Sequence, residues 1–140
     1  MTITAVWSIS SPADANAGDG LTITEPAGVD ELIRRLAEPG AGPASVWHEG
    51  RELADESTGM LDHDVVAAIS GGYGYLSHFD AEHDFAVLAG DPDSPGLHHE
   101  DVDFPAGSGV APEVLAAALR EFLETGTRPK TADWTDVDFE

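Results

Sequence analysis

The stretch VVAAISGGYGYLSHFDAEHDFAVLA, residues 65–89, contains the clearest secondary-structure pattern in the sequence. Three short runs in it are rich in β-branched, aromatic and other apolar residues, which favour strands: Val65–Ile69, Tyr73–Phe79 and Phe85–Ala89. The Gly71-Gly72 pair is typical of a tight hairpin turn with positive φ, and Asp80–Asp84 provides a slightly longer polar connection. The stretch therefore predicts an antiparallel meander of three strands.

Upstream of this meander the sequence predicts further strands and a helix. Three segments favour strands: residues 3–9, 21–24 and 44–49. The first alternates between apolar and polar positions, with Ile3, Ala5, Trp7 and Ile9 on one face. A helix is predicted around Val29–Leu36, because apolar residues recur there at i, i+3, i+4 and i+7, with Pro26 in a first-turn position. Asp30 and Glu31 suit the positive end of its dipole, and the polar residues 50–62 predict an irregular segment.

Downstream of the meander the sequence predicts a second helix at Pro112–Thr125, with an apolar stripe along one side and Gly126 as its C-cap. A further strand is expected at Glu100–Phe104, and a last extended stretch contains Trp134. Hairpins rather than alternating β-α units predict an α+β fold: a largely antiparallel sheet covered on one face by two helices. Residues 1–140 are expected to form a single domain.

The chain of 140 residues carries 27 acidic and 6 basic side chains, a formal net charge of −21. Such a charge disfavours direct binding to nucleic acid or to anionic membranes, but it attracts a basic protein and speeds association with it. The alternative is that the charge only keeps the protein soluble, or that it reflects an organism whose proteins are generally rich in acidic residues. The sequence has no cysteine, no apolar run of the ~20 residues that span a membrane, and no secretory signal, so a cytoplasmic location is expected.

The sequence contains none of the common catalytic motifs, such as HExxH, G-x-S-x-G or the Walker lysine motif. Several histidines lie among acidic residues without the spacing of metal ligands: His63, His78, His83, His98 and His99. His78 shares a strand face with Leu76 and is predicted to be a hydrogen-bonded interior residue. No catalytic residue, metal or cofactor is therefore predicted.

A protein-binding surface is the remaining hypothesis. Three aromatic side chains are candidates for its centre: Trp47, Tyr73 and Tyr75. Acidic side chains of the turn and loops that follow are candidates for its rim: Asp80, Glu82, Asp84, Asp91, Asp93, Asp101 and Asp103. If the meander brings these residues to one side, they form one patch that suits a basic partner. For Trp7, Phe85, Phe122 and Trp134, packing in the core is expected instead.

Several segments resemble immunity protein family one of bacterial polymorphic toxin systems: residues 72–79, Phe104-Pro105, and 118–129 followed by Trp134. The ending Phe-Leu-x-Thr-Gly-x-Arg-Pro…Trp is the most specific of them. The resemblance implies a non-enzymatic protein that binds and neutralises a toxin encoded beside it, often a nuclease or a nucleic acid deaminase. Gly126, Arg128 and Pro129 of this motif are interpreted as serving the fold, with Arg128 as a structural ion-pair donor.

These observations lead to one main hypothesis and two alternatives. The main hypothesis is a cytoplasmic immunity protein that forms a heterodimer with its cognate toxin, a basic deaminase or nuclease, and occludes the active-site cleft with an acidic surface. The first alternative is a small acidic binding or regulatory domain with no toxin connection. The second is a hydrolase with a metal site of histidine and aspartate.

Overall fold

The computed structural model describes residues 2–10, 13, 17–49, 53–55, 60–61, 63–80, 83–99 and 102–136. These residues form two helices and eleven strands: β1 (Ile3–Ile9), β2 (Gly18–Ile23), α1 (Pro26–Leu36), β3 (Ala41–His48), β4 (Leu53–Asp55), β5 (Met60–Leu61), β6 (His63–Ser70), β7 (Tyr73–Asp80), β8 (His83–Leu88), β9 (Leu97–His99), β10 (Val102–Phe104), α2 (Pro112–Thr125) and β11 (Trp134–Asp136). Neither helix has the length and hydropathy needed to cross a membrane.

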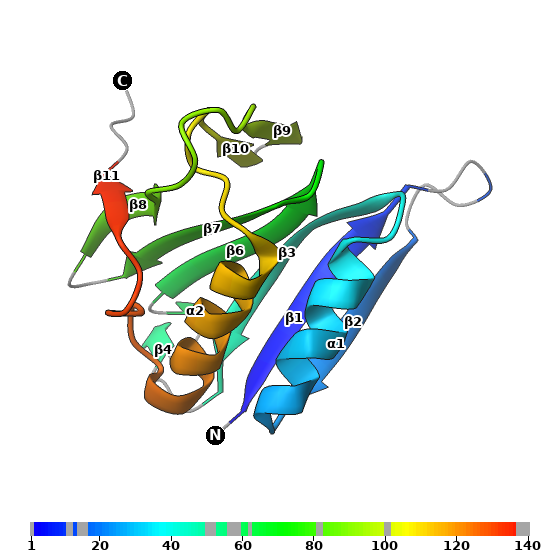
Figure 1. The fold of residues 1–140 in the computed structure, drawn as a ribbon. Coiled ribbons are helices and arrows are strands. Elements are labelled where there is room, and N and C mark those ends of the chain that lie inside the picture. The colour runs from blue at the N-terminus through cyan, green and yellow to red at the C-terminus, as the bar shows by residue number, and fades with distance from the viewer. Residues whose placement is uncertain are drawn as a thin grey trace.

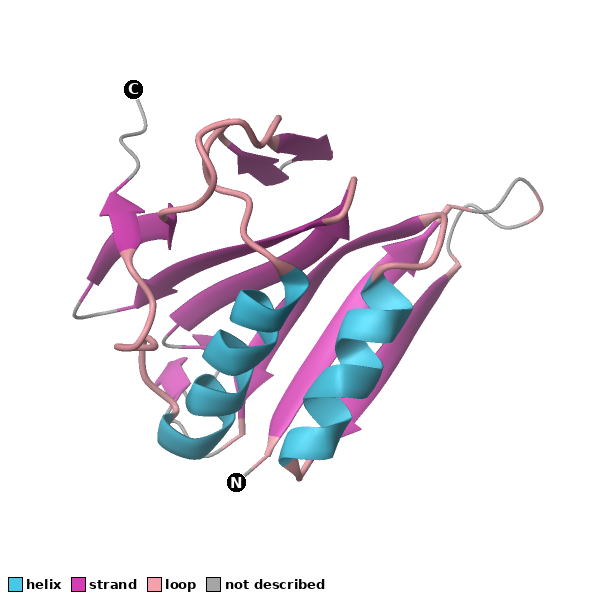
Figure 2. Ribbon diagram, viewed as in Figure 1, coloured by secondary structure: helices cyan, strands magenta, loops and turns pink. Residues whose placement is uncertain are grey.

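Seven strands form one antiparallel sheet in the order β11-β8-β7-β6-β3-β1-β2. Both helices lie on the same face of this sheet, side by side (Figure 1). The predicted α+β fold is therefore confirmed, including the meander, which is β6, β7 and β8. Figure 2 shows the two layers, with the helices in front of the sheet.

Alternation along the strands separates the two faces of the sheet. On β1, Ile3, Ala5 and Trp7 are buried in the main core beneath the helices. Thr4 and Val6, the residues between them, therefore point to the face without helices. The same face continues on β3, because Val6 lies opposite Ser45. The predicted alternation of residues 3–9 is confirmed.

The last turn of α2 and the first turn of α1 follow the sequence to different extents. Gly126 closes α2 in the left-handed conformation, with φ at 69°, and its amide donates to the carbonyl of Phe122 at 2.8 Å. Helix α1 begins at Pro26, which lies in the first turn as the sequence predicts, but that turn contains no acidic residue. The prediction that Asp30 and Glu31 occupy the positive end of its dipole is therefore wrong.

The small strand pairs were only partly predicted. The segment 50–62 was expected to be irregular, but β4 and β5 in it form a short antiparallel pair. The expected strand at Glu100–Phe104 is β10, and its antiparallel partner β9 was missed. The β9–β10 hairpin packs on the sheet face opposite the helices, where Phe104 meets Tyr75 with ring centroids 5.4 Å apart. It covers only part of that face.

Candidate protein-binding surface

Four of the sequence-predicted site residues lie at the end of the sheet where β7 begins and the β9–β10 hairpin packs, which we call the hairpin end: Tyr73, Asp91, Asp93 and Asp103. The three carboxylates are exposed, and Tyr73 is half-buried. The Tyr73 hydroxyl donates to Asp91 Oδ2 at 3.3 Å. The charge of Asp91 raises the pKa of Tyr73 above its ordinary value, with smaller effects from burial and from Asp93. The hairpin end is therefore strongly acidic.

Two predicted site residues are buried. Tyr75 lies under the β9–β10 hairpin, its hydroxyl donates to the carbonyl of Gly96 at 3.4 Å, and burial raises its pKa. Asp80 is buried with Oδ2 2.8 Å from His78 Nε2. The prediction that His78 is an interior hydrogen-bonded residue is confirmed. Neither the Tyr75 ring nor the Asp80 carboxylate lies on the surface.

Two more predicted residues lie at the opposite end of the sheet, where β3 and β7 end: Trp47 and Asp84. The Trp47 indole is half-buried and donates from Nε1 to Glu49 Oε1 at 2.8 Å. Tyr73 and Asp80 are the first and last residues of β7, so a rise of about 3.3 Å per residue separates the two ends by about 23 Å. The predicted residues therefore do not form one patch. Glu82 and Asp101 lie outside the described residues.

The sequence reasoning missed an exposed apolar area on the sheet face without helices. We call this area the open sheet face and define it by the outward residues of four neighbouring strands: Thr4 and Val6 on β1, Ser45 and Trp47 on β3, Asp64 and Val66 on β6, and Phe79 on β7. Val6 and Phe79 are each 46% exposed. The alternation of residues 3–9 already placed Val6 opposite the core face, which was the signal that could have found it.

Charge is distributed unevenly between the two faces. The seven strands of the large sheet contain no lysine or arginine. Every lysine and arginine in the described ranges lies on a helix or directly after α2: Arg34, Arg35, Arg120, Arg128 and Lys130. The open sheet face instead carries the exposed carboxylate of Asp64, with that of Glu49 beside Trp47.

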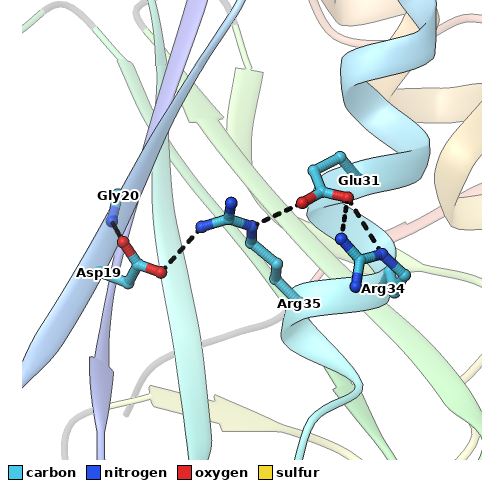
Figure 3. Close-up of polar contacts among 5 residues, drawn as sticks. All are labelled: Asp19, Gly20, Glu31, Arg34 and Arg35. Atoms are coloured by element: carbon cyan, nitrogen blue, oxygen red, sulfur yellow. Dashed lines mark hydrogen bonds and ion pairs between the residues drawn. The ribbon is translucent and has the colours of Figure 1, made fainter.

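The arginines of α1 contact carboxylates on the helix side (Figure 3). Arg35 donates to Asp19 on β2 and to Glu31, each at 2.9 Å, and Arg34 donates to the other oxygen of Glu31. Hydrogen bonds from Arg34 and then Arg35 lower the pKa of Glu31. A cleft of about 270 Å³ lies beside these pairs and is walled partly by Trp7. Both arginines that line the cleft contact carboxylates, those of Glu31 and Asp19.

Three buried histidines surround Phe122 of α2, with ring centroids 5.7 to 6.0 Å from its ring: His48, His63 and His78. The amide of His48 donates to His63 Nε2 at 3.0 Å, and His48 Nε2 lies 3.0 Å from the carbonyl of Leu123. These contacts join the sheet to α2. Within the described residues, no group of three or more potential ligands is placed to hold a metal ion.

The residues after α2 have a structural role. Arg128 places its guanidinium 5.4 Å from the centre of the Trp134 ring, and Trp134 Nε1 donates to the carbonyl of Pro129 at 2.8 Å. The contact of Arg128 is thus with an aromatic ring, where an ion pair was expected. Glu121 accepts hydrogen bonds from the amides of Lys130 and Thr131 and from the Thr131 hydroxyl.

Replacing Glu121 by glutamine is expected to lower the free energy of unfolding by about 1 kcal/mol at pH 7, because hydrogen bonds to a charged acceptor are lost. Burial raises the pKa of Glu121, but the hydrogen bonds from Thr131 and the two amides outweigh it, so the pKa lies below its ordinary value. Such stabilisation is present above the pKa of the unfolded chain and is lost as the pH falls through the lower pKa of the folded state.

Urea unfolding followed by circular dichroism, repeated from pH 7 downward, measures this difference. Glu124→Gln, on an exposed position of the same helix, is the control and is expected to change stability by less than about 0.5 kcal/mol. An equal loss in both variants, or a loss that does not shrink with acidification, contradicts the prediction.

The fold and this surface define a small α+β protein with a strongly acidic, cation-free sheet. The family model of immunity protein Imm1 matches residues 17–136, which is most of the chain. The chain therefore belongs to the Imm1 family of immunity proteins. A search of the curated proteins found no match. Family membership makes the chain an immunity protein against a toxin, with a protein as its partner.

Proposed function

We propose that this protein neutralises a cognate toxin by binding it without catalysis and occluding its active-site cleft with acidic side chains. The observation that carries the proposal is the charge distribution: a formal net charge of −21 and a seven-stranded sheet without lysine or arginine. The complex is a heterodimer that forms in the cytoplasm of the producing cell.

The charge favours a toxin that acts on nucleic acid, either a deaminase or a nuclease. Enzymes that bind phosphate backbones use lysine and arginine, so the substrate cleft of such a toxin is basic. Carboxylates placed at that cleft occupy the positions of phosphates and repel the substrate. At the hairpin end, Asp91, Asp93 and Asp103 provide exposed carboxylates around Tyr73. Asp84, near the opposite end of β7, is proposed as a separate acidic contact with the toxin, and Glu82 and Asp101 remain proposed contacts from the sequence.

Co-expression with the toxin domain encoded beside this chain tests the function. Cells that produce the toxin alone are expected to die, and cells that also produce this chain are expected to grow. The purified proteins are expected to elute together in size-exclusion chromatography at low salt. Continued killing, or separate elution of the two proteins, refutes the proposed function.

The acidic hairpin end is expected to set the rate of association. The triple variant Asp91→Asn, Asp93→Asn, Asp103→Asn is expected to bind the toxin about 10-fold more slowly at low salt, because long-range attraction is weakened. Surface plasmon resonance at several salt concentrations measures the rate, and the difference is expected to shrink as salt rises.

The matched control removes three exposed carboxylates that lie on the helices or directly after α1: Glu38→Gln, Glu113→Gln, Glu124→Gln. Both variants change the net charge equally. The control is expected to slow association less than the hairpin-end variant, because its carboxylates lie away from the hairpin end. If the two triple variants slow association to the same extent, only the total charge matters, and the assignment of the hairpin end is refuted.

A further inference from the structure

We infer that the open sheet face is the centre of the toxin interface and receives a basic protein surface with an apolar middle. The inference rests on the proposed function and adds the location of the interface to it. It also assigns different roles to the two areas: the open sheet face forms the centre of the contact, and the carboxylates of the hairpin end speed association and lie against the basic cleft.

The register brings the residues of the open sheet face together. Val6 lies opposite Ser45, and Ser45 lies opposite Val66, so these side chains follow one another across three strands. Trp47 lies opposite Thr4 in the next row. Neighbouring strands are about 4.8 Å apart, so the four strands from β1 to β7 span about 14 Å on this face.

Exposure distinguishes this area from the rest of the sheet. Three large hydrophobic side chains stand out as exposed among the described residues: Val6 and Phe79 at 46% and Val114 at 44%. Two of the three belong to the open sheet face, on strands separated by β3 and β6. The β9–β10 hairpin covers another part of this face over Tyr75, so among the described residues its exposed large apolar side chains are Val6 and Phe79.

Hydrogen bonds fix the orientation of the half-buried Trp47 indole. Its Nε1 donates to Glu49 Oε1, and the hydroxyl of Thr4 donates to the same oxygen, each at 2.8 Å. The amide of Glu49 in turn donates to the carbonyl of Thr2 at 2.9 Å. An indole fixed in this way loses little side-chain entropy on binding, and buried tryptophans are among the strongest contributors to protein interfaces.

Charge complementarity identifies the occupant. Asp64 on the face and Glu49 beside the indole are exposed carboxylates, and the strands bring no cation to balance them. Lysine or arginine of the partner meets these carboxylates and can also stack on the half-buried indole, where a cation is attracted to the ring. A second copy of this chain fits poorly, because two molecules with a net charge of −21 repel each other.

The double variant Val6→Lys, Phe79→Lys tests the inference against the toxin domain encoded beside this chain. It is expected to weaken binding at least 100-fold in surface plasmon resonance, mainly through faster dissociation, because the apolar centre is lost and cations face the basic toxin. Val114→Lys is the matched control, since Val114 has nearly the same exposure but lies on α2. It is expected to change the affinity less than 3-fold.

Every outcome decides between the two proposals. If the wild-type chain binds and the double variant binds equally well, the open sheet face is refuted while the proposed function stands. If the wild-type chain does not bind or protect, the proposed function fails. Circular dichroism shows whether the double variant folds. If it does not, Ser45→Arg at the exposed position between Val6 and Val66 replaces it under the same criteria.

Discussion

Replacing Phe122 by alanine is expected to lower the free energy of unfolding by about 3–5 kcal/mol. Phe122 is 1% exposed and fills the space between α2 and the sheet. Its ring also meets the edges or faces of three imidazoles, from β3, β6 and β7. Truncation therefore removes apolar burial and opens a cavity beside polar rings that hold the sheet to the helix.

Urea unfolding of the purified variant measures this loss. Phe122→Leu keeps most of the volume and is expected to cost about 1–2 kcal/mol. Val114→Ala, on an exposed position of the same helix, is expected to cost less than about 0.5 kcal/mol. If Phe122→Ala is no more costly than Phe122→Leu, the ring does not support the contact between α2 and the sheet in the way described.

Replacing Gly90 by alanine is expected to destabilise the fold by about 2–3 kcal/mol, because the added methyl group has no space. Its Cβ would lie 2.3 Å from the carbonyl oxygen of Gly109. The amide of Gly90 donates to the carbonyl of Gly107 at 2.9 Å, and the amide of Asp91 donates to the carbonyl of Gly109 at 2.8 Å. Both hydrogen bonds must lengthen if the two backbone segments move apart.

Gly71 provides the contrasting case. It has φ at +59° in the β6–β7 turn, and a Cβ there would meet nothing within 4 Å. Asparagine adopts this conformation more readily than other residues, so Gly71→Asn is expected to cost less than about 1 kcal/mol. Thermal unfolding of both variants compares them. A larger loss at position 71 than at position 90 contradicts the assignment of Gly90 as a site of close backbone approach.

Elements whose pattern is local could be predicted from the sequence. The β6–β8 meander and α2 follow from hairpin turns, an apolar stripe and a glycine cap, all of which act over a few residues. The β9–β10 hairpin was half missed, because three-residue strands carry too short a pattern and depend on packing against Tyr75. Pro26 marked the first turn of α1 correctly, but Asp30 and Glu31 lie beyond that turn, because the apolar stripe marks the buried side of a helix and not its first residue.

The candidate surface was harder to predict than the fold. Tyr73 and Tyr75 point to the same face of β7, and only the position of the β9–β10 hairpin buries one and leaves the other half-exposed. Asp80 could have been recognised as interior, since it shares its strand face with His78, which was predicted to be buried. The single acidic patch was wrong because residues close in sequence lie at opposite ends of an eight-residue strand.

The alternation along β1, β3, β6 and β7 has an evolutionary consequence. Residues that hold the helices and residues that face outward occupy alternate positions of the same strands. Substitutions at the outward positions can therefore adapt the inferred interface to a different toxin, while the residues that pack against the helices stay the same. A different toxin surface can thus be matched by single substitutions on a preformed sheet, without a new loop.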